Sequence, residues 1–123
     1  KIMDLSSQRQ YIQRAVNATV DLTTTNPTLI YTAPSGGDFD FAIVESILVT
    51  EDGGQQTNFT LTMTNSDSVV HTLWSQYNIS AHNTVELLTR SLILTAGEII
   101  NCTASHANKL SVIMSIVEYG KGD

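Results

Sequence analysis

Short runs of β-branched and aromatic residues recur along nearly the whole chain, and this pattern constrains the fold more than any other feature of the sequence. Between Val16 and Glu118 the runs are separated by Gly, Asn, Asp, Ser or Pro. The separation is roughly 8 to 12 residues, which is typical of all-β sandwiches and barrels. No window has the period of an amphipathic helix. The sequence therefore predicts an all-β fold, an antiparallel β-sandwich of jelly-roll or immunoglobulin-like type with about 8–9 short strands.

The strands can be placed from the apolar runs and the turn residues between them. We expect strands at residues 15–22, 28–32, 39–50, 57–64, 69–77, 84–88, 91–94, 98–104 and 109–118. The clearest alternation is in the fourth of these, where Phe59, Leu61 and Met63 share one side and polar residues share the other. One side of this strand is predicted to face the core and the other to face solvent.

A carboxylate interrupts the apolar pattern of the strand predicted at 39–50. Glu45 falls in the same register as Ile43 and Ile47, together with other odd-numbered apolar residues. Either a β-bulge re-aims Glu45, or this face of the strand meets solvent or a partner. Glycine-containing corners at 33–37, 51–54 and 95–98 end the neighbouring strands, because glycine supplies the positive φ that tight turns require.

The last predicted strand is apolar on both faces. Ile113 and Val117 lie on one face, beside Ser111 and Ser115. The opposite face carries Leu110, Val112, Met114 and Ile116. Because an inner strand of a single sandwich has only one face in the core, the second apolar face requires another layer. We therefore expect a homo-oligomer, a trimer or higher, with Ile113 and Val117 in contact between copies.

Residues 1–14, KIMDLSSQRQYIQR, are predicted to form an N-terminal arm ahead of a single sandwich domain at 15–123. The segment is mostly polar and holds half of the basic residues. Such an arm either docks on a neighbouring subunit, through residues such as Tyr11 and Ile12, or is a frayed terminus or an extra edge strand. A chain of 123 residues is long enough to bury one core without disulfides or metals.

The charge balance limits the classes of partner. Six basic and twelve acidic residues give a net charge of −6, which repels phosphate backbones and anionic lipids. We expect no nucleic-acid partner and no membrane partner. No span approaches the roughly 20 apolar residues of a membrane-spanning helix, so we also expect a soluble chain. The one cysteine, Cys102, is predicted to be a small buried hydrophobe inside a strand rather than a reactive thiol.

No pattern of residues predicts catalysis or metal binding. The three histidines form no tight ligand pair, and we expect His71 in a strand and the other two in loops. The acidic pairs at 38 and 40 and at 51 and 52 lack the alternating ligands of a calcium loop and are interpreted as solvated charges at strand ends. We expect no enzyme, no cofactor and no metal. A glycosidase whose paired carboxylates meet only in the fold is the remaining enzymatic alternative.

Two aromatic residues favour a different binding function. Trp74 and Tyr77 would suit a carbohydrate- or cell-surface-binding module if they were exposed side by side. In a regular strand Trp74 is out of phase with Leu73 and Tyr77, so they cannot all share one face. We favour Trp74 or Leu73 in the core and Tyr77 at an edge.

Several stretches resemble small β-sandwich structural proteins of tailed bacteriophages. They are LTTTNPTLIYTAP at 22–34, AIVESILV at 42–49, LTAGEII at 94–100 and ASHANKLSV at 104–112. In that class an IYTAP strand and turn leads into the first long core strand, an L-x-A-G-(D/E) corner precedes the penultimate strand, and an A-S-x-x-N-x-L loop precedes the last. The resemblance covers most of the chain from Val16 onward.

The resemblance implies a non-enzymatic virion protein that contacts other virion proteins. Members of the class decorate or cement the capsid, or act as adaptors in the neck, tail or baseplate. The matched residues are structural, with Pro34 and Gly97 at corners, so no catalytic or ligand residue is carried over. The segment 1–14 and the Gly53-Gly54 loop lie outside the match or vary freely.

Overall fold

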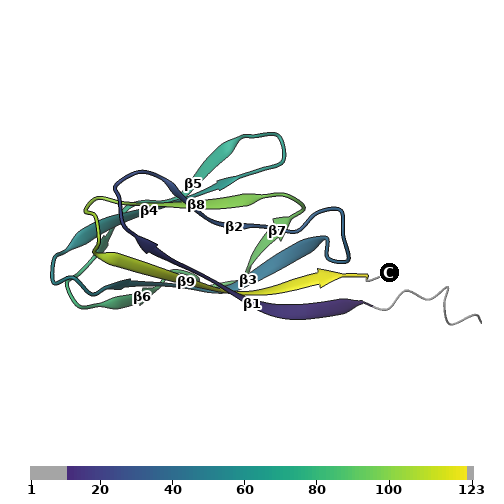
Figure 1. Cartoon of the computed structure of the whole chain (residues 1–123), viewed down its shortest axis with the longest axis horizontal. Helices are drawn as coiled ribbons and strands as arrows, with labels where there is room; N and C mark the ends of the chain where they lie inside the picture. The colour runs from purple at the N-terminus through teal and green to yellow at the C-terminus, as the bar shows by residue number, and fades with distance from the viewer. Residues whose placement is uncertain (1–10, 122–123) are drawn as a thin grey trace, which may run out of the picture.

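The computed structural model describes residues 11–121 and consists of two antiparallel sheets stacked face to face (Figure 1). The strands are β1 (Ile12–Leu22), β2 (Thr28–Thr32), β3 (Phe41–Glu51), β4 (Thr57–Thr64), β5 (Val70–Ile79), β6 (Thr84–Glu86), β7 (Leu92–Thr95), β8 (Ile99–Ala104) and β9 (Leu110–Gly120). The predicted all-β antiparallel sandwich is confirmed. Each predicted strand is present, with ends shifted by at most three residues.

Strands that are distant in sequence are neighbours in the sheets. Sheet I has the order β1-β9-β3, and β6 and β7 share the far side of β3. Sheet II has the order β2-β8-β4-β5. The first and last strands pair along their full length, from Ile12 opposite Gly120 to Leu22 opposite Leu110. The chain changes sheet at six of its eight connections, as jelly-roll and Greek-key sandwiches do.

Alternate residues of both sheets fill the space between them. On β4, Phe59 and Leu61 are fully buried and Met63 packs against them, so the predicted core side of this strand is confirmed. The buried residues of β9 are Leu110, Val112, Met114 and Ile116. Each large aliphatic or aromatic side chain buried in this way contributes about 1.5–3 kcal/mol to stability.

A β-bulge at Glu45 reverses the inward and outward alternation of the side chains along β3. A bulge was one of the two alternatives for this residue. The pairing of β3 with β9 shifts between Val44 and Ser46. As a result Ile43 lies on the outer face, whereas Ile47 is fully buried in the core. The expectation of one common face for the odd-numbered apolar residues of this strand is wrong, because the extra residue changes the phase of the alternation.

An exposed carboxylate of a neighbouring strand lies beside the bulge. Glu86 of β6 accepts hydrogen bonds from the Ser46 hydroxyl, from the Ile47 N–H at 2.8 Å and from the Leu88 N–H at 3.1 Å. Partial burial raises the pKa of Glu86, but these donors lower it further, so the pKa lies below its usual value. The Ile47 N–H, next to the register shift of β3, therefore finds a partner in Glu86.

The first strand begins earlier than predicted. Because β1 starts at Ile12, residues 12–14 belong to the sandwich as part of an edge strand. The division into an arm at 1–14 and a domain at 15–123 remains a prediction. The rest of the predicted arm, residues 1–10, lies outside the described residues.

Candidate assembly surface

The outer face of sheet I carries apolar side chains from three strands. Ile113 of β9 is 41% exposed, and Val117 lies on the same face and is half-buried. Strand β3 places Leu48 opposite Ile113 and Ile43 opposite Val117. Strand β7 places Ile93, which is 60% exposed, opposite Ile43. Directly opposed residues of antiparallel strands point to the same side, so these side chains form one row, which is interrupted by the Ser46–Ser115 pair.

An aromatic pair extends this row toward the end of β9. The rings of Phe41 and Tyr119 are stacked, with centroids 5.2 Å apart and planes 10° apart. The whole set is named here the outer apolar face. It consists of Phe41, Ile43, Leu48, Ile93, Ile113, Val117 and Tyr119. In Figure 1 sheet I is the lower layer, and no described element lies on its outer side.

The residues predicted to contact other copies are only partly brought together. Ile113 and Val117 are close on the outer face of β9. Ile12 shares the inner side of β1 with Val16, which packs against the core, so Ile12 does not join them. Tyr11 lies just ahead of β1 and is 75% exposed. Contact of any of the four with another copy remains a prediction.

Sequence reasoning missed the contributions of β3 and β7 to this face. Ile93 could have been found, since it alternates with the buried Leu94 and must therefore point away from the core. Ile43 could not, because its face depends on the bulge at Glu45.

A buried carboxylate connects three strands at one end of the sandwich. Glu118 of β9 faces inward and accepts hydrogen bonds from Arg14 Nε at 2.7 Å and from the Tyr31 hydroxyl at 2.5 Å. The Arg14 guanidinium also lies 4.1 Å from the centre of the Phe39 ring. Burial, together with the hydrogen bond and the negative charge of Glu118, raises the pKa of Tyr31 well above its usual value, although Arg14 opposes this.

The carboxylate of this cluster lies within a strand and is not solvated. Glu118 is buried between the two sheets, where Arg14 of β1 and Tyr31 of β2 already use both carboxylate oxygens. Because Tyr31 remains protonated, it stays a hydrogen-bond donor to Glu118 over the physiological pH range. These hydrogen bonds connect the two sheets, and the arrangement is structural rather than that of a general acid and base.

A second buried carboxylate organises two loops. Glu51 accepts hydrogen bonds from the N–H groups of Gly53 at 2.8 Å, Gly54 at 3.0 Å, Gln55 at 3.2 Å and His82 at 2.9 Å. Burial raises the pKa of Glu51, but these backbone donors outweigh it and hold the pKa below its usual value. The expectation of a solvated charge at this strand end is wrong, because the side chain is enclosed by the turn that follows it.

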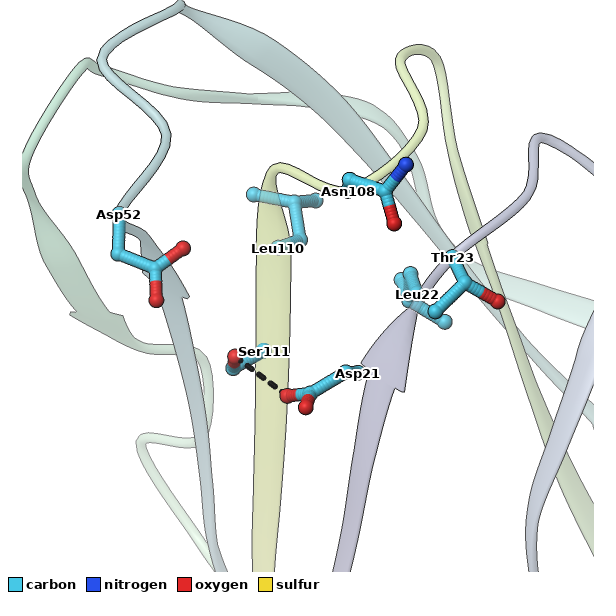
Figure 2. A pocket seen from close by; sticks show the side chains of 7 residues that line it. All are labelled: Asp21, Leu22, Thr23, Asp52, Asn108, Leu110 and Ser111. Atoms are coloured by element: carbon cyan, nitrogen blue, oxygen red, sulfur yellow. Dashed lines mark hydrogen bonds between the residues drawn. The ribbon is translucent and has the colours of Figure 1, made fainter.

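A shallow pocket opens between the ends of β1 and β9. It has a volume of about 220 Å³ and is lined by Asp21, Leu22, Thr23, Asp52, Asn108, Leu110 and Ser111. Figure 2 shows the Ser111 hydroxyl donating to Asp21, at 2.7 Å, with Asp52 across the opening. Within residues 11–121 no group of three or more His, Cys, Asp or Glu side chains is placed to hold a metal ion. The pocket lining contains this one hydroxyl–carboxylate pair and no histidine, lysine or cysteine.

Cys102 and the histidines lie where the sequence places them. Cys102 is fully buried in β8, and burial raises its pKa to about 12. The prediction of a buried, unreactive thiol is confirmed. His71 lies in β5, and His82 and His106 lie in loops. The part of the chain that the structure describes contains no helix, and so none long and apolar enough to cross a bilayer.

The aromatic residues of β5 are not exposed side by side. Trp74 packs against the core and Tyr77 is 41% exposed at the sheet edge, which confirms the favoured assignment. The expected phase difference between them is wrong. Trp74 and Tyr77 both oppose core-facing residues of β4, since a bulge that includes Gln76 separates them. A flat aromatic platform for a sugar is therefore not formed here.

Comparison with known proteins identifies the fold of the chain but does not assign it to a family. No family model matches the chain, and no curated protein matches it. A chain of the Bacillus endospore appendages, described as disulfide-linked pili, aligns with a TM-score of 0.57 and 9% identity over 94% of this chain and 92% of its own. A chain of the T13 IBDV viral particle aligns with a TM-score of 0.51 and 9% identity, over 89% of this chain and 36% of its own.

The chain shares its sandwich fold with pilus and viral-particle proteins. A chain of the capsid of Helicobacter pylori bacteriophage KHP30 has a TM-score of 0.48 and 11% identity, over 91% of this chain and 93% of its own. This chain thus spans nearly the whole length of the pilus chain but only about a third of the IBDV chain. At such identities the likeness establishes the jelly-roll-like sandwich and nothing finer.

Proposed function

We propose that this chain is a non-enzymatic structural protein of a bacteriophage virion, which acts through contacts with copies of itself and with other virion proteins. The observation that carries the proposal is the outer apolar face. A row of exposed apolar side chains on the outside of a complete sandwich is unfavourable in water, and such surfaces are normally covered by another protein. Ile93 and Ile113 are its most exposed members.

The fold and the sequence motifs support an assembling protein. The two solved structures named above with TM-scores of 0.57 and 0.51 belong to assemblies, a pilus and a viral particle. The motifs that resemble tailed-phage proteins lie in strands and corners of this fold, and Gly97 of the L-x-A-G-E corner has the positive φ of 77° that such a turn needs. The resemblance therefore rests on residues that shape the sandwich.

The cysteine content favours a virion over a pilus of the disulfide-linked kind. The chain has one cysteine, and Cys102 is fully buried with a raised pKa. A thiol in this position cannot reach another subunit while the domain is folded. Within the virion we propose the role of a capsid decoration or cement protein, or of a neck, tail or baseplate adaptor, as a trimer or higher oligomer.

Particle incorporation tests the proposal. Mass spectrometry of purified particles of a phage that encodes this chain should detect the protein, and Ile93→Asp should remove it by placing a charge on the outer apolar face. The matched control is Val70→Asp, since Val70 is 59% exposed on β5 of the other sheet. Absence of the wild-type chain from particles, or unchanged incorporation of Ile93→Asp, would refute the proposal.

A further inference from the structure

The edges of the two sheets differ in their protection against pairing with another chain. The edge strands β2, β6 and β7 have only 5, 3 and 4 residues. Strand β5 is longer, but its pairing with β4 shifts register twice, and Gln76 within it has a φ of 50°. Short and bulged edges pair poorly with further strands. The geometry of these edges therefore disfavours the addition of a strand from another chain.

Strand β1 lacks these protections. It is an edge strand of 11 residues and pairs with β9 without any register shift. It contains neither lysine nor proline. Its one basic residue, Arg14, is held by Glu118. Among the described residues no second strand pairs with β1, so the N–H and C=O groups of its free side have no partner strand. A long, regular edge of this kind is a template for strand pairing.

We propose that β1 pairs antiparallel with β1 of a second copy across a twofold axis, which joins two copies of sheet I into one continuous sheet. Only β1 offers a second copy an unbulged edge of matching length. A twofold pairing uses the same surface of both subunits and closes on itself, so it gives a dimer rather than a filament. The other edges of the second copy are too short or too irregular to replace β1.

The side chains of β1 fit this pairing in one register in particular. The pleat requires inner residues to oppose inner residues and outer residues to oppose outer ones. With the axis at Asn17, Arg14 lies opposite the partner's Val20. Gln13 lies opposite the partner's Asp21. No like charges face each other in this register, and β-branched or small residues meet along the rest of the ladder.

The pairing also doubles the surface proposed for assembly. Because the joined sheet is continuous, the outer apolar faces of both copies would lie on the same side of it. The residues of β1 on that side next to Ile113 and Val117 are Thr19 and Ala15. Their small side chains leave the two apolar rows accessible across the junction.

Charge substitution at the axis tests the proposal in the full chain. In Asn17→Lys and in Asn17→Asp, like charges face each other across the twofold axis, so each variant alone should lose pairing. Its mass in native mass spectrometry should fall to half that of the wild type. An equimolar mixture of the two variants should restore the wild-type mass as a mixed pair. Thr32→Lys, on the exposed edge strand β2, is the matched control and should keep the wild-type mass.

A second measurement does not depend on charge. Asn17→Cys should form a covalent dimer under mild oxidation, because the two substituted residues lie opposite each other, whereas Thr32→Cys should not. The buried Cys102 offers no competing thiol. An unchanged mass in Asn17→Lys, failure of the mixture to restore pairing, or equal crosslinking of Thr32→Cys would overturn the proposal. Ile93→Asp protein should retain the β1 pair, which separates this inference from the outer apolar face.

Discussion

At the scale of single residues, the chain uses carboxylates as structural anchors. Glu118 and Glu51 are buried and Glu86 is exposed, and each of the three accepts several hydrogen bonds. A carboxylate provides more acceptor sites than any neutral side chain, so it can satisfy several donors at once. Glu118 and Glu51 lack the open access that a catalytic base needs, and Glu86 already accepts from the Ser46 hydroxyl and two backbone N–H groups.

The Tyr31–Glu118 hydrogen bond predicts an alkaline weakening of the fold. The folded pKa of Tyr31 lies above its usual value of 10, so its contribution to stability is complete below pH 10 and declines as the pH rises toward the folded pKa. Tyr31→Phe should lower the free energy of unfolding by about 1–3 kcal/mol at neutral pH. Urea unfolding followed by tryptophan fluorescence should show this difference shrinking above pH 10. A constant difference up to pH 11.5 would contradict the assignment.

Glu51 predicts a change at acid pH of the opposite sign. Its folded pKa lies below its usual value of 4.5, so its contribution is present above pH 4.5 and declines as the pH falls through the folded pKa. Glu51→Gln should be less stable than the wild type at pH 7, and the gap should narrow below pH 4.5. The exposed neighbour provides the control, since Asp52→Asn should match the wild type throughout. Equal effects of both substitutions in urea unfolding would show that the loop does not depend on Glu51.

At the scale of strands, the bulge in β3 decides which side chains are buried. On β9, Ile116 faces inward and Ser115 outward, and their partners Val44 and Ser46 keep these faces with Glu45 inserted between them. Removing Glu45 therefore leaves the alternation intact, whereas removing a residue elsewhere in the strand exchanges its faces.

Deletion variants test this phase argument. The protein without Glu45 should keep a cooperative thermal transition, because Ile47 stays in the core and Ile43 stays outside. The protein without Leu48 should not fold, because every later residue of β3 changes side. Circular dichroism during heating distinguishes the two outcomes. Loss of folding in the first variant, or folding of the second, would show that the bulge does not set the phase.

The strand scale is also where sequence reasoning worked best. Alternation in residues 57–64 and apolar runs elsewhere predicted all nine strands, since periodicity and turn residues are local properties. The bulge in β5 could not be located in this way, and the bulge at Glu45 was one of two alternatives that the sequence left open, because a bulge depends on the partner strand. The same limit hid the Glu118 cluster, in which Arg14 and its carboxylate partner are 104 residues apart.

At the scale of the whole molecule, two separate surfaces of sheet I are suited to contacts between proteins. The outer apolar face offers hydrophobic area, and the free edge of β1 offers backbone hydrogen bonds. Strand edges specify register and apolar faces supply burial, so the two together can build an ordered assembly from a small domain. The sequence predicted that the chain needs a partner, because the last strand is apolar on both faces. It did not predict that β3 and β7 add side chains to the outer apolar face, since that depends on how these strands pair.

Sedimentation velocity of the full chain at micromolar concentration tests the central claim most directly. The account predicts a species larger than a dimer, with an even number of copies, for the wild type and for Val70→Asp. It predicts a dimer for Ile93→Asp, because the charge blocks the outer apolar face and leaves the β1 pair in place. A wild-type chain that sediments as a monomer, or an Ile93→Asp variant that sediments as the wild type does, would contradict it.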